Sequence, residues 1–164
     1  MESNKVENKL KLTESLSSVI NQKHKKLLFV GIGNVLRSDD GVGVYICKRL
    51  KTNKNISTLI VEVSFENYIK KVNEYNPDIL ILVDCVNFNK EPGYADFIPV
   101  ERIKDFTTST HNISLKRISE FFKMEVMVLG IQPASLIFGE NLTVSVKEAA
   151  DRLVENINNI IKKF

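Results

Sequence analysis

Residues 79–85 read Ile-Leu-Ile-Leu-Val-Asp-Cys, a continuous run of branched apolar side chains that ends in an acid and a thiol. A run of this kind is typical of a strand that is buried on both faces. Residues 27–33 read Leu-Leu-Phe-Val-Gly-Ile-Gly, a second such run, which glycines bring to an end. Strands buried on both faces belong to parallel sheets covered by helices, so these two runs decide the fold class.

Strand and helix patterns alternate along the rest of the chain. Further strands are expected over residues 57–63, 94–100 and 124–131, and helices over residues 41–51, 66–75, 115–123 and 145–164. Ser145 and Glu148 have the spacing of a capping box at the start of the last helix. The sequence therefore predicts an α/β fold, a three-layer sandwich in which a mainly parallel, twisted five-stranded sheet carries helices on both faces.

The chain has 164 residues, 43% of them hydrophobic, which suits one domain with a single core. We expect that domain to span residues 27–164. Residues 1–26 are polar and rich in lysine, and are expected to form a basic, solvated N-terminal extension. Part of the extension is expected to be helical, because Val6, Leu10, Leu16 and Ile20 recur roughly at helical spacing.

Composition argues against several classes of protein. The net charge of +3 is too small to indicate a nucleic-acid or membrane partner. No apolar run approaches the roughly 20 residues of a membrane helix, and the N-terminus does not resemble a signal peptide. Cys47 and Cys85 both lie in apolar stretches and are expected to be reduced, buried thiols. Together these features predict a cytoplasmic protein, which we expect to be monomeric.

Three side chains with metal-binding chemistry follow or end predicted strands. Asp40 lies after the first strand, Asp84 ends the third, and His111 precedes a helix after the fourth. In a doubly wound sheet, ligands bind beyond the carboxyl ends of the strands, where the first and third strands are commonly neighbours. Two carboxylates and an imidazole suit a divalent transition metal such as nickel or zinc. Each residue also has a purely structural interpretation, as a helix cap, a loop contact or a surface histidine.

A nucleotide-binding loop is one alternative. Gly31 and Gly33 follow a strand and precede a helix, as dinucleotide-binding folds require. The third glycine position, however, is Leu36, and Asp39 and Asp40 at the helix entrance compete with a phosphate.

A thiol protease is another alternative, with Cys85 as nucleophile and His111 as base. Adjacent residues of a strand point to opposite faces of the sheet. If Asp84 faces the crevice, Cys85 is therefore expected to face the core.

Residues 31–43 read Gly-Ile-Gly-Asn-Val-Leu-Arg-Ser-Asp-Asp-Gly-Val-Gly and resemble the signature of the hydrogenase maturation proteases. Four further segments continue the resemblance in chain order: Glu66–Asn67, Ile81–Asp84, Ser109–Asn112 and Gly130–Pro133. The resemblance covers nearly everything from residue 27 to the C-terminal helix. The last two segments look most like the branch that processes hydrogenase-3-type enzymes.

The resemblance implies a hydrolase of the aspartyl type, an endopeptidase that removes the C-terminal extension of a [NiFe] hydrogenase large-subunit precursor after nickel insertion. Two acids and a histidine bind metal in this family, and Asp40, Asp84 and His111 occupy those positions here. The first acid is glutamate in some members. The implied metal is the nickel of the precursor, with no organic cofactor.

Two roles of the metal remain open. The three residues can bind the precursor's nickel and so restrict cleavage to precursors in which nickel is already inserted. Alternatively, a metal can polarise the scissile carbonyl. The first is favoured because the chain has no His-Glu-x-x-His motif of zinc proteases. A nickel-binding hydrogenase chaperone without peptidase activity, which could use the same three residues, is the remaining alternative.

Overall fold

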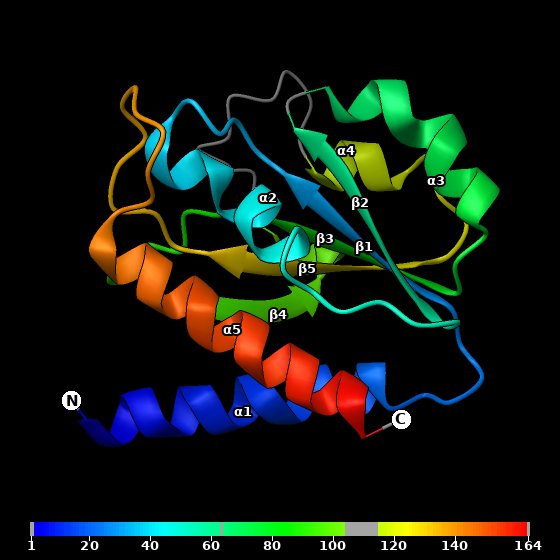
Figure 1. The fold of residues 1–164 in the computed structure, drawn as a ribbon, viewed down its shortest axis with the longest axis horizontal. Coiled ribbons are helices and arrows are strands. Elements are labelled where there is room, and N and C mark those ends of the chain that lie inside the picture. Colours follow the sequence, from blue (N-terminus) through cyan, green and yellow to red (C-terminus); the bar gives the residue numbers. More distant parts are fainter. Residues whose placement is uncertain (1, 63, 104–114, 164) are drawn as a thin grey trace.

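The computed structural model describes residues 2–62, 64–103 and 115–163, which form a five-stranded sheet with helices on both faces (Figure 1). The strands are β1 (Leu27–Ile32), β2 (Ile56–Glu62), β3 (Ile79–Cys85), β4 (Ala95–Pro99) and β5 (Glu125–Ile131). They lie in the order β2-β1-β3-β5-β4, and every pair is parallel except β4–β5. This is the mainly parallel α/β sandwich that the sequence predicts.

Five α-helices in the described part of the chain cover the sheet. The helices α1 (Glu2–Ile20), α2 (Val42–Cys47) and α5 (Val144–Lys162) share one hydrophobic core, while α3 (Ile69–Tyr75) and α4 (Leu115–Ser119) share the other. Short 3-10 turns lead into α2, α3 and the segment after β4: η1 (Ser38–Gly41), η2 (Phe65–Tyr68) and η3 (Val100–Arg102). None of the helices within the described ranges combines the length and apolar character needed to cross a membrane.

The strand β3 lies at the centre of the sheet, and all seven of its residues are buried. Its side chains alternate between the two cores: Ile79, Ile81 and Val83 pack beneath α2 and α5, whereas Leu80 and Leu82 pack beneath α3 and α4. Burial on both faces explains why the sequence of this strand is continuously apolar.

The chain reverses its winding direction between β1 and β3. From β1 it passes outward to β2 on one side, and from β3 it continues to β4 and β5 on the other. Such a reversal opens a crevice at the carboxyl ends of the two central strands, where α/β proteins bind their ligands.

The N-terminal segment differs from the solvated extension expected from its composition. It is the helix α1, which lies beside α5 (Figure 1), and its residues Leu16, Val19 and Ile20 are buried in the same core as α5. The first turns match the expectation better, because Val6 and Leu10 are 59% exposed. The helix expected from the spacing of Leu16 and Ile20 is confirmed, and that spacing marks the face of α1 that packs against the core.

The start of α5 also differs from the prediction. The helix begins at Val144, its N-cap is Thr143, and the structure gives no side-chain capping hydrogen bond there. The capping box predicted at Ser145 and Glu148 is therefore wrong. The hydroxyl of Thr143 instead donates to Asp39, which lies 104 residues earlier in the chain.

Candidate active site

Two glycines let the segment after β1 fold back tightly over the ends of β1 and β3. A Cβ on Gly43 would lie 2.0 Å from the carbonyl oxygen of Val83 and 2.4 Å from that of Ile32. Gly33 has a φ of 136°, and a Cβ there would lie 1.7 Å from the carbonyl oxygen of Asp40. Glycine is therefore required at both positions. The result is direct backbone contact between α2 and β3, which places η1 and its Asp40 at the carboxyl end of β3.

Asp40 and Asp84 meet at the carboxyl end of β3, and both are completely buried. Asp40 Oδ2 accepts a hydrogen bond from the Asn34 amide at 3.2 Å, and Asp84 Oδ1 accepts one from the Cys85 amide at 2.8 Å. The Cys85 thiol donates to Asp40 Oδ1 at 3.4 Å. One ligand atom from each of Asp40, Asp84 and Cys85 lies within 4.8 Å of the other two. The structure thus brings together two of the three residues predicted from the sequence.

The third predicted residue, His111, lies outside the described residues, because residues 104–114 are not among them. The segment Ser109–Asn112 that carries the resemblance falls in the same interval.

Cys85 belongs to the core beside Ile81 and Val83, as strand alternation predicts. The sequence does not show, however, that its thiol also lies close to both acids. Asp84 accepts a hydrogen bond from the Cys85 amide, and Asp40 accepts one from the thiol. Cys85 is 0% exposed, which argues against a nucleophile that must reach a substrate carbonyl.

The neighbouring acid Asp39 has a structural role that the sequence does not reveal. Its carboxylate accepts hydrogen bonds from the amides of Ala134, Ser135 and Thr143 at 2.7–3.0 Å, and from the Thr143 hydroxyl. These donors all belong to the loop between β5 and α5. Asp39, which is also buried, therefore fixes that loop beside the site, and of the pair Asp39–Asp40 only the second approaches Asp84 in the described structure.

Gln132, in the predicted family segment after β5, orders the loop that follows β3. Its Oε1 accepts hydrogen bonds from the amides of Phe88 and Lys90, at 2.7 and 3.3 Å. Its backbone pairs with Gly93 and Tyr94. The side chain is buried, so it supports the chain beyond Asp84 rather than offering a group to a ligand.

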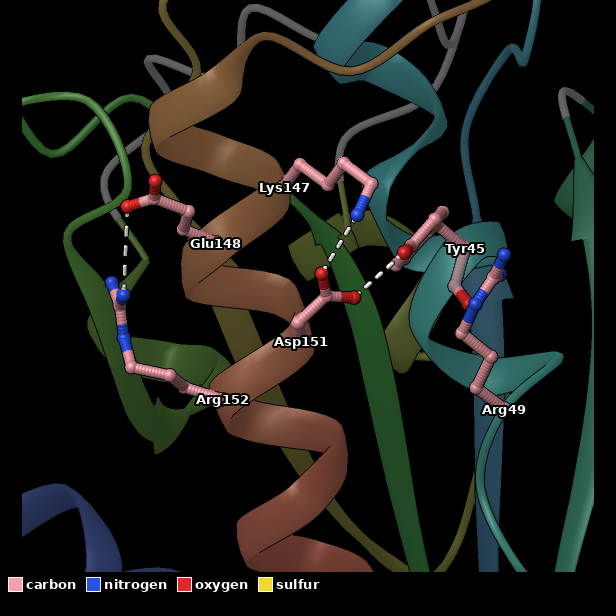
Figure 2. Close-up of polar contacts among 6 residues, drawn as sticks. All are labelled: Tyr45, Arg49, Lys147, Glu148, Asp151 and Arg152. Carbon is pink, nitrogen blue, oxygen red and sulfur yellow. Dashed lines mark hydrogen bonds and ion pairs between the residues drawn. The ribbon is translucent and has the colours of Figure 1, made fainter.

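A polar network holds α2 against α5 (Figure 2). The Tyr45 hydroxyl donates to Asp151 at 2.6 Å, Lys147 pairs with the same carboxylate at 2.8 Å, and the Arg49 guanidinium lies 3.5 Å from the centre of the Tyr45 ring. The hydrogen bonds from Lys147 and then Tyr45 hold the pKa of Asp151 below its usual value. Because α2 follows directly from η1, this network helps to fix the segment that carries Asp40.

Apolar side chains are exposed on the loops next to the site. Leu36 is 46% exposed, Ile137 and Phe138 in the β5–α5 loop are 74% and 81% exposed, and Val144, the first residue of α5, is 76% exposed. Backbone hydrogen bonds join the two loops, since Ser38 donates to the Gly139 carbonyl and the Gly139 amide to that of Leu36.

An open groove of about 230 Å³ runs between α2 and the β5–α5 loop. Its lining combines apolar and charged side chains: Val35, Ser38, Gly41, Val44, Tyr45, Lys48, Arg49, Glu140 and Leu142.

The chemistry of these residues favours a metal over a nucleotide. Two carboxylates and a thiol within 4.8 Å offer oxygen and sulfur donors of the kind that divalent transition metals bind. A phosphate, in contrast, needs open backbone amides at a glycine loop. Here Gly33 is packed against the backbone of Asp40, and the helix entrance carries two buried acids.

A doubly wound sheet with two buried acids converging at its point of reversal defines an α/β protein with a candidate metal site. Comparison with known families makes the identity more specific. The model of the family described as hydrogenase maturation protease matches residues 47–160, and the chain belongs to that family. Membership makes it a hydrolase, specifically a protease.

Individual relatives agree with this family. The chain is 29% identical over 154 residues to a putative hydrogenase maturation protease of Methanocaldococcus jannaschii, covering 85% of this chain and 90% of that one. It is 26% identical over 132 residues to the hydrogenase 3 maturation protease of Escherichia coli K12, covering 77% and 85%. Its fold matches the crystal structure of a [NiFe] hydrogenase maturation protease from Thermococcus kodakarensis, with a TM-score of 0.74, 28% identity and coverage of 84% and 93%.

Proposed function

We propose that this chain is an endopeptidase that removes the C-terminal extension of a [NiFe] hydrogenase large-subunit precursor once nickel has been inserted. Asp40, Asp84 and His111 bind the nickel ion of the precursor, which is part of the substrate. The client is a hydrogenase of the hydrogenase-3 type, in keeping with the similarity to the Escherichia coli hydrogenase 3 protease. The observation that carries the proposal is the convergence of Asp40 and Asp84, both fully buried, at the end of β3.

Recognition of nickel would explain why the enzyme cleaves only the nickel-loaded precursor and leaves other proteins intact. Two neighbouring buried carboxylates repel each other, and a divalent cation between them removes that repulsion. A precursor that carries nickel supplies this cation, whereas an unloaded precursor does not. A required contact of this kind discriminates strongly between a precursor that carries nickel and one that does not.

The bond broken is a peptide C–N bond, and water is the default nucleophile. Addition of water across that bond leaves a new carboxyl terminus on the large subunit and a new amine on the released extension. A metal bound by the same residues would polarise the scissile carbonyl. Either carboxylate can accept the proton that the attacking water loses, which would make the enzyme functionally an aspartyl-type endopeptidase.

The precursor itself is a folded protein, and the surroundings of the site suit a protein partner. The exposed apolar residues Leu36, Ile137 and Phe138 lie on the loops joined to η1, next to the groove beside α2. Val144, at the start of α5, is exposed as well. Exposed apolar groups of this kind mark protein contacts. Because Asp40 and Asp84 have no exposed surface, docking must also move the chain around them before nickel can reach them.

The experiment that tests the proposal is a trimming assay. The purified chain is incubated with large-subunit precursor that either contains or lacks nickel, and mass spectrometry follows loss of the C-terminal extension. We expect cleavage of the nickel-loaded precursor alone. Asp40→Asn, Asp84→Asn and His111→Ala are each expected to lower the rate at least about 100-fold.

Matched controls separate loss of the site from a general loss of charge. Glu155→Gln removes an exposed acid of α5, and His24→Ala removes the histidine that is not part of the proposed site. Both are expected to trim at the normal rate. Normal trimming by all three site variants would refute the assignment of the site.

A nickel-binding chaperone without peptidase activity is the second candidate, because the same residues could serve it. It predicts a stable complex with the precursor and no change in the precursor's mass. Trimming by the purified chain excludes it.

A further inference from the structure

Cys85 is placed as a metal ligand would be. Its sulfur lies 3.4 Å from Asp40 Oδ1, and the ligand atoms of Asp40, Asp84 and Cys85 all lie within 4.8 Å of one another. The residue ends β3 directly after Asp84, and the thiol is completely buried.

The distance between the Cys85 sulfur and the Asp40 oxygen can be compared with the distances between adjacent ligand atoms in metal sites. Metal–sulfur bonds are about 2.3 Å and metal–oxygen bonds about 2.1 Å, so adjacent ligand atoms are separated by about 3.1 Å at a right angle and about 3.6 Å at the tetrahedral angle. The observed 3.4 Å between Cys85 Sγ and Asp40 Oδ1 falls between the two values. An ion can therefore bind both atoms with little movement of either residue.

We infer that Cys85 supplies its sulfur as a further ligand to the metal ion that Asp40 and Asp84 bind. The inference rests on the proposed function, because the ion is the same. The thiol loses its proton to solvent when the ion binds, as coordinating thiols do. Its sulfur makes the site softer than carboxylates alone would, which favours nickel, cobalt or zinc over magnesium or calcium.

The second cysteine shows the contrast. Cys47, in α2, is buried in the apolar core, and that burial raises the pKa of its thiol far above the usual range. No carboxylate is grouped with Cys47 among the described residues that could hold a metal. A thiol in an apolar core stays protonated, so Cys47 serves as the matched control within the same protein.

The test uses Co²⁺ alone as the probe, added to the full, reduced chain. A thiolate bound to Co²⁺ produces a charge-transfer absorption band in the near ultraviolet, which carboxylates do not produce. We expect the band in the wild type and in Cys47→Ala, and its loss in Cys85→Ala and in the nearly isosteric Cys85→Ser. Affinity for Co²⁺ should fall at least about tenfold in both Cys85 variants. Circular dichroism verifies that each variant is folded.

The outcomes separate this inference from the proposed function. Co²⁺ binding that depends on Asp40 but gives no thiolate band overturns the role of Cys85 and leaves the proposed site intact. Co²⁺ binding that Asp40→Asn does not weaken removes the basis of both. A chain that trims nickel-loaded precursor but binds no Co²⁺ also overturns the inference, while the proposed function stands.

Discussion

The adjacent acids Asp39 and Asp40 are predicted to have opposite mutant phenotypes. Asp39 accepts hydrogen bonds from three backbone amides and one hydroxyl of the β5–α5 loop, whereas Asp40 approaches Asp84 and Cys85. Replacing either by asparagine changes one oxygen to an NH₂ group and hardly alters the shape. We therefore expect Asp39→Asn to destabilise the fold, and Asp40→Asn to remove function with a smaller effect on stability.

The size of the Asp39→Asn effect follows from its hydrogen bonds. The Ala134 and Ser135 amides bind Oδ2, and the Thr143 amide binds Oδ1. An asparagine has one oxygen, which can replace either Oδ1 or Oδ2 of Asp39. The orientation that keeps more hydrogen bonds places this oxygen at the Ala134 and Ser135 amides, so the NH₂ group faces the Thr143 amide. Loss of one hydrogen bond to a charged group costs about 2 kcal/mol. For a chain of this size, that corresponds to a fall in Tm of about 4–8 °C.

Asp40→Asn is expected to change Tm less than Asp39→Asn does. Asp40 accepts a hydrogen bond from the Asn34 amide, and the oxygen of an asparagine can keep that bond. Thermal unfolding followed by circular dichroism, with the trimming assay in parallel, measures both variants. Limited proteolysis provides a local readout, because a loosened β5–α5 loop should be cut at its exposed tip near Phe138.

The roles assigned to the two acids are wrong if Asp39→Asn has the Tm and protease resistance of the wild type, or if Asp40→Asn is the variant that unfolds. The first result would mean that the amide donors of the loop find other acceptors. The second would mean that Asp40 supports the fold rather than the chemistry.

Three further predictions concern the surroundings of the site. Gly43→Ala is expected to cost about 3 kcal/mol or more, measured by urea unfolding, because its Cβ would collide with backbone carbonyls of both β1 and β3; a cost below 1 kcal/mol would contradict the packing. Replacing Ile137 and Phe138 together by serine should raise KM for the precursor about 5–30-fold while Tm stays constant, and an unchanged KM would show that the loop does not touch the precursor. Asp151→Asn should lower Tm slightly near neutral pH, and the difference from wild type should vanish as pH falls through the depressed pKa of Asp151, since a carboxylate with a lowered pKa stabilises the fold only while ionised; a difference that persists in acid would exclude this cause.

The order and type of the central strands were predictable because short, continuous stretches of sequence determine them. Continuous apolar runs identify β1 and β3 as strands buried on both faces, and the carboxyl ends of such strands converge wherever the fold places them side by side. The meeting of Asp40 and Asp84 follows from that rule. It required no knowledge of side-chain contacts.

The contacts that were missed all depend on long-range packing. Nothing in the sequence indicates that Asp39 would bind the loop before α5. The apolar spacing that includes Leu16 is visible in the sequence, but its packing partner α5 is not. Strand alternation correctly places Cys85 in the core, but it does not show that η1 brings Asp40 beside the thiol.

The pairing of α1 with α5 has a consequence for synthesis. The two helices are joined by a hydrogen bond from Asn156 to Thr13, groups that are 143 residues apart. A ribosome adds about 5–20 residues per second, so α1 leaves the exit tunnel on the order of 10 s before its partner exists. During that interval its apolar stripe faces water or a chaperone, and its many lysines and glutamates help to keep the nascent chain from aggregating.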